Sequence, residues 1–109
     1  MNTEIKFSTA DLEKKLGGLT FARLLAAYRL AEDKSQKDFA KFLKISQQSL
    51  CDLEKGRKIP SPERAAKIAS RLKEPKNFWI QLAIQDFLRE QNLYYAVNLT
   101  ELKNHRSAA

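Results

Sequence analysis

The segment 35–56, SQKDFAKFLKISQQSLCDLEKG, constrains the fold of this chain more than any other. In its first half Phe39 and Leu43 stand four residues apart, and in its second half Leu50 and Leu53 stand three apart. These spacings place each apolar pair on one face of a helix and do not alternate as strand residues do. The segment therefore predicts two short helices in close succession.

The ends of these helices carry signals of their own. Ser35 and Ser46 can each accept a backbone N–H that the first helical turn leaves unpaired. Lys44-Ile45 forms the turn between the helices, and the small side chain of Ala40 permits a close approach where they cross. We therefore expect two helices joined by a tight turn.

Polar, uncharged side chains open the second helix, at Gln47, Gln48 and Ser49. A glutamine amide can bond bidentately to N6 and N7 of adenine, so we expect Gln47 and Gln48 to read base edges. Cys51 and Asp52 follow one turn later on the same faces and are further base-reading candidates. Cys51 would contact a thymine methyl group or only fill space. Asp52 would accept from cytosine N4, or repel phosphate and so narrow the set of tolerated sequences.

This segment resembles the helix-turn-helix of the lambdoid phage repressors and of the bacterial family named after the Xre repressor. The resemblance covers residues 19–73 and rests on Gln36, on Ala40, and on the runs SQQSL, LEKGRK and IPSP. It departs from the family at Lys44, where glycine is common. A left-handed residue at that position costs roughly 1 kcal/mol with a lysine side chain.

The resemblance implies an all-α, five-helix lambda-repressor-like DNA-binding domain, here with a short N-terminal arm and a strand-like C-terminal tail. It also implies a structural ion pair in the core between Arg29 and Glu54. Taken alone, Arg29 lies at the edge of an apolar stripe and would be interpreted as a solvated residue, because charged residues are rarely buried. The pair would lock the helix at 20–32 to the end of the second motif helix.

Basic residues follow the second motif helix directly. Lys55, Arg57 and Lys58 surround Gly56, in a loop that resembles the one with which the family binds phosphates. Basic surface residues are more commonly only solubilising, and that alternative stays open. The expected phosphate-binding residues are Gln36, Ser46, Ser49, Lys55, Arg57 and Lys58.

The charge balance fits such a partner. Among 109 residues, 20 Lys and Arg face 13 Asp and Glu, so the net charge is +7. This favours a polyanion such as DNA, although an acidic protein groove would fit too. The single cysteine excludes an internal disulfide, and neither a signal peptide nor a membrane-spanning run is recognisable. No cofactor, no metal site and no paired catalytic carboxylates stand out, and we expect a cytoplasmic protein that is not an enzyme.

We expect one domain at 19–92, an arm at 1–18 and a strand-like segment with a disordered tail at 93–109. The arm would carry a short helix at 11–16 or remain partly disordered. A further helix should begin at Ser61-Pro62. Its basic face would follow the DNA backbone or, as is more usual, be solvated; that face carries Arg64, Lys67 and Arg71.

The last expected helix, at 76–91, is apolar on more than one side. A surface helix buries a single face, so the second face predicts a dimer interface or a site that the N-terminal arm covers. Two copies would place their motif helices about 34 Å apart, as a palindromic operator requires. The expected interface residues are Phe78, Trp79, Leu82, Ile84, Phe87, Tyr95 and Val97.

Residues 93–99, LYYAVNL, alternate as a strand does. A single strand must pair, so it would pair with its copy across a dimer or join the sheet edge of another protein. The alternative is an irregular apolar tail packed on the last helix.

These observations favour a dimeric, sequence-specific DNA-binding repressor of transcription that recognises a palindromic operator in double-stranded DNA. Small family members of this kind, such as HipB-like and HigA-like proteins, are often antitoxins that autoregulate an operon. The resemblance thus also implies a toxin protein, such as a HipA-like kinase or a ribonuclease, as a partner. The alternatives are a toxin-neutralising adaptor whose DNA binding is secondary, and a plain phage-type repressor.

Overall fold

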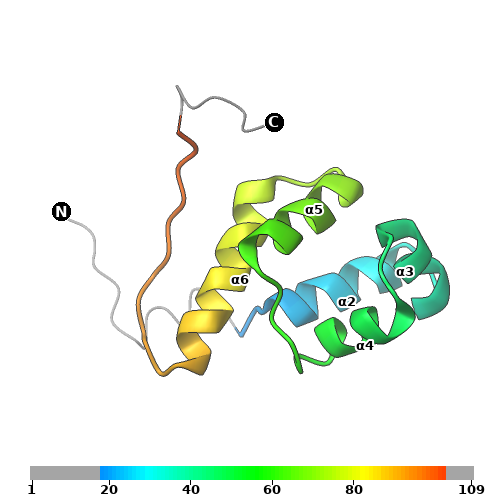
Figure 1. Cartoon of the computed structure of the whole chain (residues 1–109), viewed down its shortest axis with the longest axis horizontal. Helices are drawn as coiled ribbons and strands as arrows, with labels where there is room; N and C mark the ends of the chain where they lie inside the picture. Colours follow the sequence, from blue (N-terminus) through cyan, green and yellow to red (C-terminus); the bar gives the residue numbers. More distant parts are fainter. Residues whose placement is uncertain (1–17, 103–109) are drawn as a thin grey trace.

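The computed structural model describes residues 18–102, which form five α-helices and an extended tail (Figure 1). No strand occurs in this part of the chain, so the predicted all-α, five-helix lambda-repressor-like fold is confirmed. The predicted helix at 11–16, the arm as far as residue 17 and the residues after 102 lie outside the described range. The helices are α2 (Phe21–Ala31), α3 (Gln36–Leu43), α4 (Gln47–Glu54), α5 (Pro62–Leu72) and α6 (Lys76–Glu90).

Hydroxyl side chains start the first four of these helices. The side-chain oxygens of Thr20, Ser35, Ser46 and Ser61 each accept the backbone N–H three residues further on, at distances between 3.0 and 3.1 Å. Each such cap is worth about 1 kcal/mol, so these helix starts are specified locally. In contrast, α6 follows Pro75 and has no side-chain cap.

Two helices end on a lysine in the left-handed conformation. Lys44 has a φ of 61° and Lys73 a φ of 59°. The Lys44 N–H donates to the Lys41 carbonyl at 3.1 Å, and the Ile45 N–H donates to the Ala40 carbonyl at 3.0 Å. A residue with a Cβ is strained in this conformation by about 1–2 kcal/mol. The turn between α3 and α4 is therefore left-handed at Lys44, the position where the resembling family commonly has glycine.

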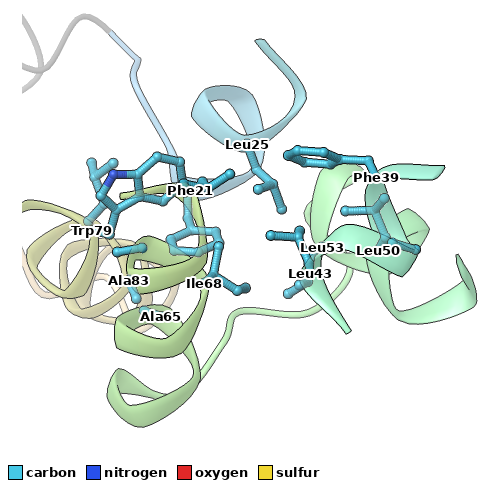
Figure 2. Close-up of a cluster of buried hydrophobic side chains, with 14 residues drawn as sticks. Phe21, Leu25, Phe39, Leu43, Leu50, Leu53, Ala65, Ile68, Trp79 and Ala83 are labelled. Carbon is cyan, nitrogen blue, oxygen red and sulfur yellow. The ribbon is translucent and has the colours of Figure 1, made fainter. Parts of the chain in front are cut away.

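The core joins α2, α5 and α6 on one side to the motif helices on the other (Figure 2). Trp79 lies at the α6 end of this cluster (Figure 2), with its ring edge-on to Phe21 at 5.4 Å and to Tyr28 at 6.2 Å between ring centroids. The buried apolar side chains are Phe21, Leu25, Phe39, Ala40, Leu43, Leu50, Leu53, Ala65, Ile68, Ala69, Leu72, Trp79, Leu82 and Ala83.

The burial of α6 corrects two of the expected dimer contacts. Trp79 is 1% exposed and Leu82 is 3% exposed, so both belong to the core of the single chain and are not available to a second copy. Sequence periodicity could not separate them from the outer stripe, because apolar residues occur on more than one side of α6. Phe78 and Phe87 remain exposed, at 42% and 53%.

Asp86 ties α6 to the start of α2. Its carboxylate accepts the Phe21 N–H at 2.8 Å and pairs with the Arg89 guanidinium at 3.2 Å. Burial raises the pKa of the Asp86 carboxyl, and these two donors act in the opposite direction. The bond orients α2 against α6, since an acceptor from a distant helix satisfies an N–H that α2 itself leaves unpaired.

The tail after α6 is extended but belongs to no sheet within the described residues. The Leu93 N–H closes the end of α6 by donating to the Leu88 carbonyl at 2.8 Å. The chain then runs back alongside α6 (Figure 1), where Gln85 bonds to the backbone of Tyr95 and Val97. Within the single chain the tail is attached to α6 through Gln85, while Leu93, Tyr94 and Tyr95 stay exposed, at 44%, 45% and 66%.

Candidate nucleic-acid interface

The second motif helix, α4, divides into an inner and an outer side. Leu50 and Leu53 are buried, and α4 packs against α2 and α3. Gln47 and Gln48 at its first turn are exposed, and Cys51 further along is half-buried. The predicted base-reading residues therefore lie together on a polar surface that a DNA groove can reach, although their contacts with bases stay a prediction.

Asp52 holds two of the predicted DNA-contacting side chains in place. One of its carboxylate oxygens accepts from Gln48 Nε2 at 3.1 Å and from the Arg57 guanidinium, also at 3.1 Å. The backbone carbonyl of Asp52 accepts the Arg57 N–H at 2.9 Å as well. Asp52 thus links the outer side of α4 to the basic loop, an arrangement that neither interpretation of this residue from sequence anticipated.

Glu54, two residues further on, faces the interior. Its carboxylate forms the expected bidentate pair with Arg29, with distances of 2.8 Å to Nε and 3.1 Å to the second guanidinium nitrogen. Arg29 also donates to the Lys34 carbonyl at 2.9 Å. The hydrogen bond to Glu54 raises the pKa of the Arg29 guanidinium further above its usual value. This pair fastens α2 to the end of α4.

Gln36 joins the same part-buried cluster. Its side-chain Nε2 donates to Glu54 at 2.9 Å, from the first residue of α3. The expected phosphate contact by Gln36 stays a prediction, and the structure adds a second role, because its amide connects α3 to α4. The family resemblance pointed to the two positions but not to this bond.

Arg64 is a residue whose contact with the motif was not foreseen. From the first turn of α5 its guanidinium donates to the Ser49 hydroxyl at 3.0 Å. The only signal in the sequence was its place on the basic face of that helix. Ser46 and Ser49 are thus both engaged within the protein, since Ser46 caps α4 and Ser49 accepts from Arg64.

The basic loop after α4 lies open to solvent. Lys55, Gly56, Arg57 and Lys58 are all exposed. Gly56 has a φ of 73°, a conformation that glycine adopts without strain. Lys55 and Lys58 form no ion pair with any described residue, so their charges are free to act on an anion.

Residues 18–102 lack two further features. They contain no group of three or more His, Cys, Asp or Glu side chains that could hold a metal ion. Nor is any helix in this range long and apolar enough to cross a membrane. Cys51 is a half-buried free thiol.

Comparison with known proteins identifies one family. A family model described as Helix-turn-helix matches residues 25–79. The match begins within α2 and ends within α6. It contains the outer side of α4, the basic loop, and the cluster of Arg29, Gln36 and Glu54. No curated protein and no solved structure matches the chain.

Proposed function

We propose, since this chain belongs to the helix-turn-helix family of DNA-binding transcription regulators, that it is a dimeric repressor of a palindromic operator. Gln47 and Gln48 would read base edges in the major groove, with Cys51 and Asp52 beside them. The observation that carries the proposal is the outer side of α4, where exposed glutamines adjoin the open basic loop.

Phosphate contacts would come from both ends of the motif. Lys55, Arg57 and Lys58 would neutralise phosphates and release counterions, which makes affinity depend steeply on salt. Gln36, Ser46 and Ser49 would contribute uncharged donors at the starts of α3 and α4, where backbone N–H groups also attract anions. These contacts position the protein on DNA, while the glutamines select the sequence.

We further propose that the protein is a cytoplasmic antitoxin that represses its own operon and binds a toxin protein. Exposed apolar side chains away from α4 support a protein partner, as at Phe78, Phe87 and Tyr95. A hollow of about 420 Å³ lined by Ile59, Pro60, Ser61, Pro62, Ala83, Ile84 and Phe87 lies on the same side of α6 as Phe87. The alternatives are an adaptor that neutralises a toxin with little use of DNA, and a plain phage-type repressor.

The test is a titration with labelled DNA from upstream of the gene, repeated at several salt concentrations and with scrambled competitor. Replacing Gln47 and Gln48 by Ala should reduce discrimination between operator and scrambled DNA by about 1–3 kcal/mol for each glutamine that reads a base. Gln91→Ala is the matched control, because Gln91 is an exposed glutamine at the end of α6. Equal competition by scrambled DNA in the wild type would refute specific recognition.

A toxin gene in the same operon, whose product binds both variants equally, would support the antitoxin role.

A further inference from the structure

One buried side chain holds the extended tail against α6. Gln85 is 4% exposed and is the sole polar residue buried among residues 18–102. Its Nε2 donates to the Tyr95 carbonyl at 2.6 Å, and its Oε1 accepts the Val97 N–H at 3.0 Å. Both halves of the amide are thus used on the backbone of residues 95–97.

This pair of bonds reproduces one step of a parallel ladder. In such a ladder a residue lies opposite one residue of the next strand. Its N–H donates to the carbonyl of the residue before that one, and its carbonyl accepts the N–H of the residue after it. The Gln85 amide does the same around Ala96. Because each residue of a strand directs its N–H and C=O to the same side, Tyr95 and Val97 direct theirs toward α6. Tyr94, Ala96 and Asn98 direct their N–H and C=O groups away from α6.

The outer edge of the tail is therefore unpaired. Ala96 and Asn98 are exposed, and the backbones of Tyr94, Ala96 and Asn98 make no hydrogen bond with any described residue. A row of unpaired N–H and C=O groups is a template for another strand. The chain thus carries a preformed edge, held straight by a side chain and not by a neighbouring strand.

We propose that this edge pairs with the same edge of a second copy, as an antiparallel two-stranded ribbon with its twofold axis at Ala96. An axis at Ala96 makes the two copies of Ala96 a hydrogen-bonded pair, whereas an axis at Tyr95 or Val97 would make a non-hydrogen-bonded pair of two larger side chains. An axis at Ala96 sets Tyr95 opposite Val97 of the second copy, and Leu93 opposite its Leu99. The first pair joins an aromatic to a β-branched side chain and the second joins two apolar side chains, and both combinations are favourable across strands.

The composition of the tail favours a second copy as the occupant. Residues 93–100, LYYAVNLT, contain no charged side chain, although the whole chain carries a net charge of +7. Two such tails can therefore meet without like charges facing each other. The smallest side chain of the stretch stands on the axis, where two identical side chains must fit side by side. Tyr94 and Tyr95 are exposed at 45% and 66% and would lose that exposure in the pair.

This pairing specifies the dimer that the proposed repressor requires, and it is tested without DNA. In a Cys51→Ser background, Ala96→Cys is oxidised mildly and analysed without reductant. Directly opposed residues of a hydrogen-bonded antiparallel pair lie about 5.5 Å apart between Cα atoms, within disulfide reach. The matched control is Thr100→Cys, whose two copies would lie about 27 Å apart at about 3.4 Å per residue.

The expected result is a disulfide-linked dimer for Ala96→Cys and a monomer band for Thr100→Cys. Failure of Ala96→Cys to cross-link, or equal cross-linking of both variants, overturns the proposal. If the wild type binds its operator while Ala96→Cys does not cross-link, the inference fails and the proposed function stands. If Ala96→Cys cross-links but the wild type binds no operator, the proposed function fails and the inference stands.

A second variant tests the hydrogen bonds themselves. Ala96→Pro removes an outward N–H and leaves the two groups bonded to Gln85 intact. Sedimentation should show at least a tenfold rise in the dimer dissociation constant, with an unchanged melting temperature for the helical domain. Glu101→Pro is the control, since it lies beyond the stretch of central pairs. A wild type that sediments as a monomer, or a proline at 96 that leaves the dimer intact, overturns the proposal.

Discussion

Two acidic residues of α4 stand two positions apart and do opposite things. Two steps along an α-helix turn the side chain by about 200°, so Glu54 faces the core and Asp52 faces outward. Glu54 is 5% exposed and is bonded to Arg29 and Gln36, whereas Asp52 is 17% exposed and is bonded to Gln48 and Arg57. The same chemical group thus holds three helices together on one side and arranges DNA-facing side chains on the other.

The largest effect is expected on the inner side. Glu54→Ala leaves the Arg29 guanidinium, whose side chain is only 16% exposed, without its partner. The free energy of unfolding should fall by at most about 3–5 kcal/mol, the cost for a fully buried pair. Urea titration followed by circular dichroism measures this. The double variant Arg29→Met with Glu54→Leu should lose much less, because no charge is stranded. A loss below about 1 kcal/mol in the single variant would show that the pair is not structural.

The turn that connects the two motif helices comes next. Lys44→Gly should raise the free energy of unfolding by about 1 kcal/mol, because glycine adopts the left-handed conformation without strain. Lys41→Gly, in the interior of α3, should instead lower it by about 0.5–1 kcal/mol. Thermal unfolding of both variants gives the comparison, and a change of the same sign in both would contradict it.

Substitutions on the outer side of α4 should change DNA binding and leave the free energy of unfolding nearly unchanged. Asp52→Ala breaks an exposed pair, so the free energy of unfolding should change by less than about 1 kcal/mol. Without its carboxylate, Gln48 and Arg57 lose their tether, and affinity for scrambled DNA should rise relative to the operator. Arg57→Ala should reduce the slope of log affinity against log salt by about one, as the removal of one phosphate contact requires. Competition titrations test both, and a strongly destabilised Asp52→Ala would remove the contrast with Glu54.

The smallest effect concerns a third acid, Asp86. Since burial raises the pKa of this carboxyl, the folded state binds its proton more tightly than the unfolded state. Stability should therefore fall slightly as the pH rises from the ordinary aspartate range, near 3.9, through the folded-state pKa. Asp86→Asn should flatten this part of the stability curve in urea titrations at a series of pH values. A steeper decline in the variant would mean that the Phe21 and Arg89 contacts outweigh burial.

Much of the motif region was predictable because its determinants are close in sequence. Ser35 and Ser46 cap helices that begin at the next residue, and Lys44 takes the left-handed turn three residues before Gln47. The partnership of Arg29 with Glu54 came from the family resemblance, since an isolated arginine carries no such signal. The contacts of Gln36, Asp52 and Arg64 were not predictable, because any of several donors could have reached the same acceptors.

The amino-acid sequence by itself determined the helices, their caps and the tight turn, because capping and periodicity act within a few residues. Its motifs also identified the helix-turn-helix family, by resemblance. Only the tertiary structure decided which apolar residues of α6 are core, placing Trp79 and Leu82 inside and leaving Phe87 outside. It also decided the fate of the tail, where an alternating pattern became an extended segment bonded to Gln85. Periodicity predicts that a side chain will be buried or that a backbone will be extended. Which residues then cover that side chain or bond to that backbone is decided by packing between distant parts of the chain.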